Sequence, residues 1–393
     1  MTILHLITRL ILGGAQQNTV ITCAAQVKAG HAVTLAYGPI YGPEGSLRDE
    51  AKASGAALVE VPTLRRSVLP WHDLRCYREL RALIRRVKPD VVHTHSSKAG
   101  ILGRAAAWAE GVPCVVHTIH GLPFHDRQWW PVRRAYIAAE RWAARRCHKL
   151  IGITQAMCDA FAQRRIGRPE QFTVIPSGVE TARFPHPQAA CGLAIREVLD
   201  IAVGAPVVGM VGRFDALKGH ADLLSIAPML AERLPDVRFL FVGDGWNRAN
   251  IERRAAAADL GGRVIMTGLV PPTEAPPLYA AMDVVALPSY QEGQGRVLVE
   301  AMLCGCAVVA YDTGGIRDVV IDNVTGRLVP RGNRAALGEA IARLLEHPDQ
   351  RQRLAEQGRE HALKHFDARV MVEQVERVYQ HVLNKTRRHG GTE

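Results

Sequence analysis

Two glutamates separated by seven residues form the feature best suited to bind a ligand. Glu292 and Glu300 bound the segment EGQGRVLVE, which follows an apolar, strand-like run at 283–287. Glycines at a strand-to-helix junction let the backbone approach a ligand closely, and the helix N-terminus presents unpaired N–H groups to phosphate. Carboxylates accept hydrogen bonds from sugar hydroxyls. The segment predicts a site for an elongated ligand that carries phosphate and hydroxyl groups; the alternative is a solvated loop glutamate and a helix-surface glutamate.

A second charged loop has the same setting. The segment 212–219, GRFDALKG, directly follows the apolar run 206–211 and precedes a helical pattern. Arg213 and Lys218 then lie at the carboxyl end of a strand, where ligands bind in parallel sheets. A guanidinium fork and a compact ammonium suit a diphosphate. The alternative is a pair of solvated loop cations.

Two weaker features lie in the first half. Gly13 and Gly14 follow the strand pattern 2–8, but they do not form a dinucleotide-binding fingerprint. The His93-Thr94-His95 spacing can bind metal, yet no acidic or cysteine partner stands at a suitable spacing, so we expect no metal site. His120 ends a predicted strand, where it could touch a reacting sugar or serve as a structural histidine.

The positive charge is concentrated in the first half. The formal net charge is +11; residues 1–185 contain 25 Lys and Arg against 13 Asp and Glu, and the rest of the chain contains 24 against 25. The segment 129–146 combines Trp129, Trp130 and Trp142 with several arginines, a composition that suits an anionic membrane surface. The alternatives are a helix packed on its own sheet and a basic surface that only aids solubility.

The elements that position these residues alternate in both halves. Strands are expected at 2–8, 31–37, 57–61, 90–95, 114–118, 149–153 and 172–176, then at 206–211, 237–242, 263–267, 283–287 and 307–310. Helical patterns lie between them, and two long helices are expected at 350–365 and 368–385. Short apolar strands that alternate with helices predict parallel sheets covered on both faces. Proline and glycine steps mark a connection at about 178–204.

Composition restricts the class of protein. The chain has 393 residues, 48% hydrophobic and 22% charged, which suits two globular domains. No apolar run is long enough for a membrane span, and we expect no signal peptide because Arg9 interrupts the first apolar run. Eight scattered cysteines with no C-x-x-C pair favour a cytoplasmic protein.

Taken together, these motifs resemble those of the retaining GT-B glycosyltransferases of family 4. PSYQEGQGRVLVEAMLCG resembles the E-x7-E signature, GRFDALKG the GRL-x-x-x-KG element, IPSGVE the end of the first domain, and LHLITRLILGGAQ the opening strand and glycine loop. The resemblance implies an α/β fold of two Rossmann-like, doubly wound parallel-sheet domains that face each other across a cleft. It places an acceptor-binding domain at 1–180, a nucleotide-sugar domain at 181–365 and a helix at 366–393 that crosses back to the first domain, with a frayed tail.

The resemblance also implies roles for single residues. Arg213 and Lys218 would neutralise the donor diphosphate, Glu300 would hold the ribose hydroxyls, and Glu292 would meet the donor sugar. His120 would lie beside the transferred sugar. The resemblance implies that Gly13 and Gly14 lie on the acceptor side. It also implies donor contacts for eight further residues: Gly212, Leu269, Val270, Gly293, Gln294, Gly295, Arg296 and Val297. Gln294 and Arg296 depart from the commonest signature, so the sugar is left open; Arg296 contacts phosphate or faces solvent.

The implied reaction retains the anomeric configuration and needs neither an essential metal nor another cofactor, because Arg, Lys and a helix N-terminus supply the positive charge. The expected partners are a UDP- or GDP-sugar, a glycan or lipid-linked acceptor of a polysaccharide pathway, and an anionic membrane surface, without nucleic acid. The expected location is the cytoplasm, with peripheral contact at the inner face of the membrane. The alternatives are a nucleotide-sugar 2-epimerase of the same architecture, a NAD-dependent oxidoreductase, which the missing fingerprint disfavours, and a non-catalytic basic binding protein.

Overall fold

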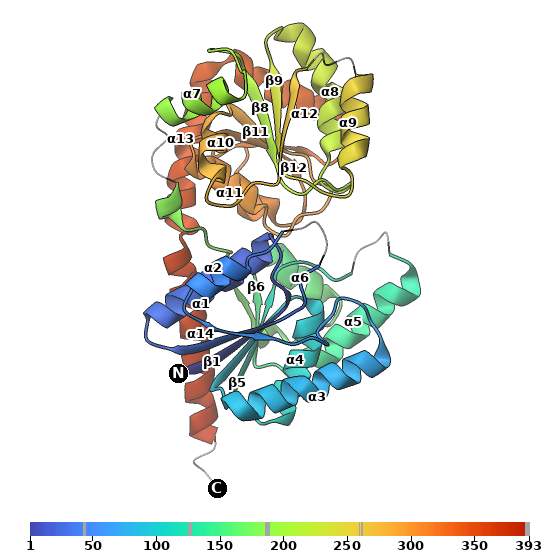
Figure 1. Ribbon diagram of the computed structural model, residues 1–393, viewed down its shortest axis with the longest axis vertical. Coiled ribbons are helices and arrows are strands. Elements are labelled where there is room, and N and C mark those ends of the chain that lie inside the picture. The colour runs from blue at the N-terminus through green and yellow to red at the C-terminus, as the bar shows by residue number, and fades with distance from the viewer. Residues whose placement is uncertain (42–44, 125–127, 185–188, 259, 261, 390–393) are drawn as a thin grey trace. The chain divides into compact units, whose positions relative to one another are not determined.

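The computed structural model describes residues 1–393 except 42–44, 125–127, 185–188, 259, 261 and 390–393. The chain forms two compact units: unit 1 comprises Met1–Gly178 and Ala368–Glu393, and unit 2 comprises Val179–Asp367. Each unit is a parallel sheet with helices on both faces (Figure 1). Within the described residues, no helix combines the length and the apolar character needed to cross a bilayer.

The sheet of unit 1 has seven parallel strands in the order β3-β2-β1-β4-β5-β6-β7. The strands are β1 (Thr2–Arg9), β2 (Ala32–Gly38), β3 (Ala57–Glu60), β4 (Val91–His95), β5 (Cys114–Ile119), β6 (Lys149–Gly152) and β7 (Phe172–Val174). Strand order reverses between β1 and β4, which creates the position where doubly wound sheets bind ligands.

Alternate strand residues of unit 1 pack against different helices. The helices are α1 (Gly14–Lys28), α2 (Arg48–Ala53), α3 (Pro70–Val87), α4 (Ser97–Ala109), α5 (Trp130–Ala144), α6 (Gln155–Gln163), η1 (Pro169–Gln171) and the last helix, α14 (Ala368–His389). Ile3 packs on the face covered by α1 and α14, whereas Leu4 packs on the face covered by α3 and α4. This follows from the two-residue period of a strand.

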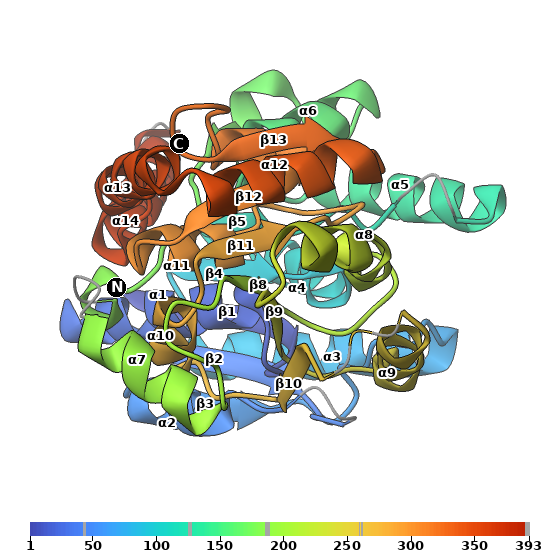
Figure 2. The same cartoon turned by 90° about the horizontal axis from the view of Figure 1, so that it is seen from above.

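Unit 2 has six parallel strands in the order β10-β9-β8-β11-β12-β13, which Figure 2 shows in sequence across the sheet. The strands are β8 (Val207–Val211), β9 (Arg238–Val242), β10 (Val264–Gly268), β11 (Val284–Leu287), β12 (Ala307–Asp312) and β13 (Arg327–Pro330). The helices are η2 (Thr181–Arg183), α7 (Ala189–Val198), α8 (His220–Arg233), α9 (Arg248–Ala257), α10 (Ala275–Ala280), α11 (Arg296–Leu303), η3 (Gly314–Asp318), α12 (Arg334–Glu346) and α13 (Pro348–His365).

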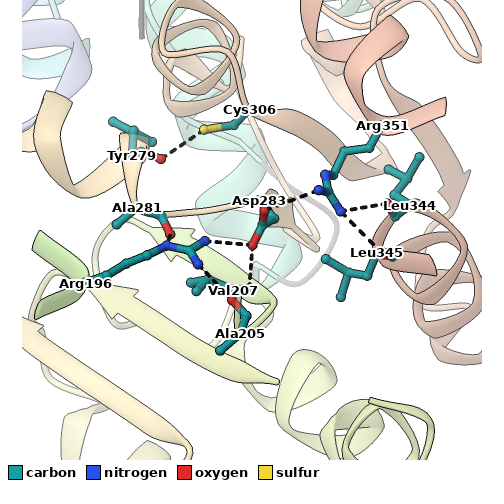
Figure 3. A network of polar contacts seen from close by, with 10 residues as sticks. All are labelled: Arg196, Ala205, Val207, Tyr279, Ala281, Asp283, Cys306, Leu344, Leu345 and Arg351. Atoms are coloured by element: carbon teal, nitrogen blue, oxygen red, sulfur yellow. Dashed lines mark hydrogen bonds and ion pairs between the residues drawn. The ribbon is translucent and has the colours of Figure 1, made fainter. Parts of the chain in front are cut away.

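Asp283 ties the beginning of the central strands of unit 2 to two helices (Figure 3). One carboxylate oxygen accepts hydrogen bonds from the Val207 amide at 2.8 Å and from Arg196 of α7 at 2.9 Å. The other lies 3.6 Å from Arg351 of α13. Two partly buried arginines on one carboxylate hold the amino end of the sheet, opposite the edge where ligand-binding loops emerge.

Several elements differ from the sequence-based expectations. Strand β13 and helix α6 were not predicted, and α14 continues to His389 beyond the predicted end at 385. β13 is a short strand at the sheet edge with Arg and Pro at its ends, so it lacks the apolar run of the central strands. Pro185 and Pro187, which marked the connection, lie outside the described residues.

Candidate functional site

The two charged loops of unit 2 emerge beside each other at the reversal of strand order. β8 and β11 are neighbours in parallel pairing, with Val284 opposite Val208. Residues 212–219 follow β8 and residues 288–295 follow β11. Both loops therefore leave the carboxyl edge of the sheet at its topological switch point. Residues separated by about 80 positions in sequence meet at one edge.

Backbone contacts fix the loop after β8. Gly219 has φ +85°, and a Cβ there would lie 2.0 Å from the carbonyl oxygen of Pro288, so glycine permits both the left-handed conformation and the close approach. Gly212 donates its N–H to Val242 at 2.9 Å. Arg213 is about half exposed, and its guanidinium contacts Asp215 at 3.0 and 3.1 Å. A partly exposed, oriented guanidinium is suited to an anionic ligand.

The loop after β11 ends in Gly295, whose backbone conformation favours glycine. Gly295 adopts the left-handed conformation, φ 75°, and immediately precedes the first residue of α11. A Cβ at this position would lie 2.4 Å from the Cδ1 atom of Ile316, so a larger residue would have to displace that side chain and would also strain the left-handed backbone. Gln294 beside it is buried. Arg296 and Val297 form the first turn of α11, whose leading N–H groups carry partial positive charge.

Lys218 and Glu292 join the two loops. The Lys218 ammonium lies 2.5 Å from the Oε1 atom of Glu292, and both side chains are largely buried, with 24% and 11% exposed. The carbonyl oxygen of Glu292 is also approached by Gly314, where a Cβ would lie 2.4 Å away. The pair places a cation and a carboxylate at one point of the sheet edge, which suits a ligand with both an anionic part and hydroxyl groups.

Glu300 is held by two neighbours from the same unit. Its Oε2 atom accepts a hydrogen bond from the Tyr279 hydroxyl at 3.0 Å, and its Oε1 atom accepts one from Arg296 at 3.1 Å. Burial raises the pKa of Tyr279 well above its usual value, and the charge of Glu300 adds to the shift. Tyr279 therefore stays a donor. Since a carboxylate has about four acceptor positions, Glu300 keeps capacity for hydroxyl groups of a ligand.

Leu269 and Val270 follow β10 at the same edge of the sheet. Leu269 is 47% exposed, whereas Val270 packs against the core. The N–H of Gly243, after β9, donates to the carbonyl oxygen of Gly268 at 3.0 Å, which ties the neighbouring loop to this one. A partly exposed residue next to an anchored valine can offer its backbone polar groups to a flat ring.

Unit 1 carries the remaining candidate residues. Gly13 precedes α1 and Gly14 is its first residue, after β1, and His120 directly follows β5, so all three are at the carboxyl edge of the unit 1 sheet. Gly13 has φ −179°, an extended conformation open to any residue. A Cβ at Gly13 would meet only the flexible side chain of Gln16, so steric fit alone does not require glycine there.

A cluster of buried histidines surrounds the unit 1 candidates. His5, His93 and His95 have ring nitrogens within 4.8 Å of one another, close enough to share a metal ion. However, all their ring nitrogens already have hydrogen-bond partners, which are Gln26, Tyr379, Thr118, His120 and members of the cluster itself. The arrangement is a hydrogen-bonded network. His5 was absent from the sequence-based candidates because its partners Gln26 and His95 are 21 and 90 positions away and form no local motif with it.

Large apolar side chains are exposed on unit 1. Trp129 is 71% exposed and Trp130 61%, at the beginning of α5. A second exposed group, which the sequence analysis did not identify, precedes and begins α3: Val68, Leu69, Trp71 and Leu74, with Trp71 84% exposed. Arg65, Arg66, Arg134 and Arg141 are exposed near these residues in sequence. Exposed tryptophans with arginines are typical of surfaces that contact membranes or other partners.

The structure therefore gathers the predicted residues into two groups, each within its own unit. In unit 2 it brings together Arg213, Lys218, Glu292, Gly295 and Glu300. In unit 1, Gly13, Gly14 and His120 share one sheet edge. Tyr279 was missed by the sequence analysis because it lies in no motif, and Asp215 was missed because only the cations of the segment 212–219 were considered there.

Two family descriptions match the chain. Residues 12–183 match "Glycosyltransferase Family 4", and residues 193–361 match "Glycosyl transferases group 1". Among curated proteins, the chain is 30% identical over 289 residues to the UDP-Gal:alpha-D-GlcNAc-diphosphoundecaprenol alpha-1,3-galactosyltransferase of Escherichia coli, covering 73% of this chain and 74% of that protein. It is 32% identical over 277 residues to the 2-deoxystreptamine glucosyltransferase of Streptomyces kanamyceticus, covering 68% and 70%.

Solved structures show the same fold. HepE from Anabaena, solved in complex with UDP and glucose, matches with a TM-score of 0.84 at 23% identity, covering 97% of this chain and 99% of that chain. WaaG, a glycosyltransferase involved in lipopolysaccharide biosynthesis, matches with a TM-score of 0.75 at 19% identity, covering 95% and 98%. The predicted GT-B fold of two Rossmann-like, parallel-sheet domains is confirmed.

Proposed function

We propose that this chain, which belongs to the glycosyltransferases of family 4, binds a nucleoside-diphosphate sugar on unit 2 and transfers the sugar to a glycan or lipid-linked acceptor. Transfer of a sugar is the activity of the family and of the curated relatives. The relatives named above are transferases, which favours transfer over the epimerase and binding-protein alternatives. The proposal goes further and specifies the class of donor, the class of acceptor and the roles of single residues.

The observation that most supports a donor site is the ion pair between Lys218 and Glu292, in the loops that lead to α8 and α11. Arg213, Lys218 and the first N–H groups of α11 bind the diphosphate. In this proposal the departing nucleoside diphosphate gains negative charge beside these positive groups, which stabilise it. We infer that the reaction needs no essential metal or other cofactor, because this protein charge can replace a cation.

The ribose, the sugar and the base of the donor bind along the same edge of the unit 2 sheet. Glu300, oriented by Tyr279 and Arg296, accepts hydrogen bonds from the ribose hydroxyls. Glu292 and the backbone of 293–295 contact the sugar, and the backbone at Leu269 and Val270 contacts the base. We favour a UDP-sugar, since the Escherichia coli relative is named for UDP-Gal and HepE was solved with UDP.

His120 of unit 1 contacts the transferred sugar, and Gly13 and Gly14 border the acceptor. The reaction retains the anomeric configuration: the acceptor oxygen attacks the anomeric carbon from the face that the diphosphate leaves. The departing diphosphate takes the proton of the acceptor hydroxyl, so atoms and charge balance without a second protein base. This role predicts that His120→Ala lowers kcat with little effect on nucleotide affinity.

A lipid-linked acceptor would bring the enzyme to a membrane surface. The name of the Escherichia coli relative includes diphosphoundecaprenol, a lipid-linked substrate. The exposed groups of unit 1, around Trp71 on α3 and Trp129 just before α5, combine apolar and cationic side chains. We propose that they bind the anionic inner face of the cytoplasmic membrane peripherally.

A donor screen with product analysis tests the proposed function. Thermal unfolding is measured with UDP-, GDP- and ADP-sugars, because a bound ligand raises the midpoint by mass action. The stabilising donor, radiolabelled in its sugar, is then incubated with and without a lipid-linked glycan. Label transferred to the glycan supports the proposal. Label that remains on the nucleotide as an epimer, with no acceptor required, would replace it with the epimerase alternative.

A further inference from the structure

Three neighbouring strands of unit 1 bring a row of histidines to one place. In the parallel register His5 of β1 lies opposite His93 of β4, and β4 pairs with β5, which His120 follows. His93 and His95 share one face because they are two residues apart. His5, His93 and His95 are fully buried, with at most 1% exposed. Polar rings buried this deeply need defined partners.

A continuous chain of hydrogen bonds joins Gln26 to His120. The Gln26 Oε1 atom lies 2.8 Å from His5 Nε2. His5 Nδ1 lies 3.0 Å from His95 Nε2, and His95 Nδ1 lies 3.0 Å from His120 Nε2. The chain begins on α1, passes through β1 and β4, and ends after β5. The chain of hydrogen bonds thus connects Gln26, a helix residue outside every motif, with His120, the candidate residue at the edge of the sheet.

The rings of this chain are neutral. Burial lowers the pKa of His5 to about 4 and that of His120 to about 3, and burial, together with neighbouring histidines, lowers that of His95 well below its usual value. A neutral imidazole donates from one nitrogen and accepts at the other. Once one ring has its proton assigned, every other ring in the chain is therefore assigned as well.

The Gln26 side chain sets the direction. Its carbonyl oxygen faces His5, so His5 donates from Nε2 and accepts at Nδ1. The proton of His95 is then on Nε2, and so is the proton of His120.

We propose that Gln26, His5 and His95 are positioning residues that fix His120 as the Nε2–H tautomer, leaving its Nδ1 lone pair to accept a hydrogen bond from a sugar hydroxyl. His120 Nδ1 is buried and has no hydrogen-bond partner among the described residues. The choice of a sugar hydroxyl rests on the proposed function. The tautomer rests only on the chain of contacts within unit 1.

The same chain limits what His120 can do. A proton bound at Nδ1 could move along the three rings only as far as Gln26, whose carboxamide is a poor proton acceptor. The chain therefore offers no exit for a proton, and burial keeps the His120 ring neutral, so His120 acts as a hydrogen-bond acceptor and not as a proton relay. His5 and His95 thus serve to orient the Nδ1 lone pair of His120.

Nitrogen-15 NMR of histidine-labelled protein tests the proposal without substrate. Long-range correlations distinguish the Nε2–H from the Nδ1–H tautomer, and His120→Gln identifies the signals of His120. We expect the Nε2–H form for His5, His95 and His120 in the wild type at pH 7.5. An Nδ1–H form at His120 would overturn the proposal, and this measurement needs no variant of the positioning residues.

Two variants of Gln26 test the origin of the tautomer. Gln26→Leu removes the acceptor, so His120 should show both tautomers and kcat should fall about fivefold to tenfold, with the donor KM nearly unchanged. Gln26→Glu keeps the acceptor and should retain the wild-type tautomer. An unchanged tautomer in folded Gln26→Leu would overturn the role of Gln26. If the tautomer is as expected but His120→Ala remains fully active, the proposed contact with the sugar fails while the tautomer assignment stands.

Discussion

The Lys218 ammonium lies 2.5 Å from the Oε1 atom of Glu292, and the two residues are 74 positions apart in the chain. The contact joins the loops that follow β8 and β11, the two strands where the order of the unit 2 sheet reverses. The proposed phosphate-binding cation and the proposed sugar-binding carboxylate thus hold each other in position. A donor that binds Lys218 through its diphosphate would bring its sugar toward Glu292.

Replacement of Glu292 by Gln should separate turnover from nucleotide binding. The amide keeps a polar side chain but removes the charge that pairs with Lys218, so kcat should fall at least about tenfold. The affinity for UDP should stay the same or increase, because Lys218 loses its competing carboxylate. Steady-state kinetics and calorimetric titration with UDP measure the two quantities. A parallel loss of UDP affinity would contradict the assigned division of roles.

Removal of the Tyr279 hydroxyl should weaken donor binding through Glu300. In Tyr279→Phe the donor KM should rise by about fivefold, the effect of one hydrogen bond that orients the carboxylate. Glu300→Ala should raise it further, and the double variant should resemble Glu300→Ala alone because the two residues act as a unit. Additive effects would show that Tyr279 acts independently of Glu300.

The stability of unit 1 should fall as the pH is lowered from about 6.5 to about 4.5. Burial keeps the pKa of His5 at about 4 and that of His120 at about 3, whereas unfolded histidines titrate near 6.5. Between these values the unfolded chain binds more protons, so acidification favours unfolding. Each such histidine contributes up to about 1.4 kcal/mol per pH unit. The other buried histidines of unit 1 with pKa values well below the usual one are His93, His95 and His117.

Urea unfolding at several pH values checks this dependence. The Glu110 carboxylate, whose pKa is lowered to about 2 by Arg85 and Arg81, affects the stability mainly below its unfolded pKa of 4.5, which is the lower end of this pH range. His220 is the corresponding buried histidine of unit 2, with a pKa lowered to about 4 by burial, so unit 2 should respond less. Equal stability of unit 1 at pH 6.5 and 4.5 would contradict the neutral, buried cluster.

Membrane binding should depend on the exposed tryptophans of unit 1. Trp71→Ser and Trp129→Ser should each reduce binding to vesicles of anionic lipid, and salt should weaken the binding of the wild type. Trp246→Ser is the matched control, since Trp246 is 80% exposed but lies in unit 2. Co-sedimentation measures the bound fraction. Equal recovery from neutral and anionic vesicles would remove the proposed membrane contact.

Much of the fold follows from local sequence patterns. The run Val207–Val211, then glycine, then a helical pattern predicts a buried strand, a close-approach loop and a helix, and the structure has β8 and α8 there. α6 escaped prediction because its buried residues, Met157, Cys158 and Phe161, occupy one short helix of nine residues. Such a segment shows too few turns for a clear helical period.

Fewer features of the site than of the fold could be predicted from the sequence. Glycines and charges after predicted strands identified Arg213, Lys218 and Glu292, because the ends of parallel strands meet at one edge. Tyr279 and His5 carry no local signal, since their partners come from strand order and helix packing. The ribose role of Glu300 came from the family resemblance, whereas the sugar contact of His120 was also inferred from its place at a strand end; both remain predictions.

Calorimetric titration of UDP and UMP tests the central claim, that Arg213 and Lys218 hold the diphosphate of the donor. We expect Arg213→Ala and Lys218→Ala each to weaken UDP binding at least about tenfold while changing UMP binding much less. Arg233→Ala is the control, because Arg233 pairs with Glu339 and Glu346 at the opposite end of α8. If both variants bound UDP as tightly as the wild type and the control, the assignment of the diphosphate site would be wrong.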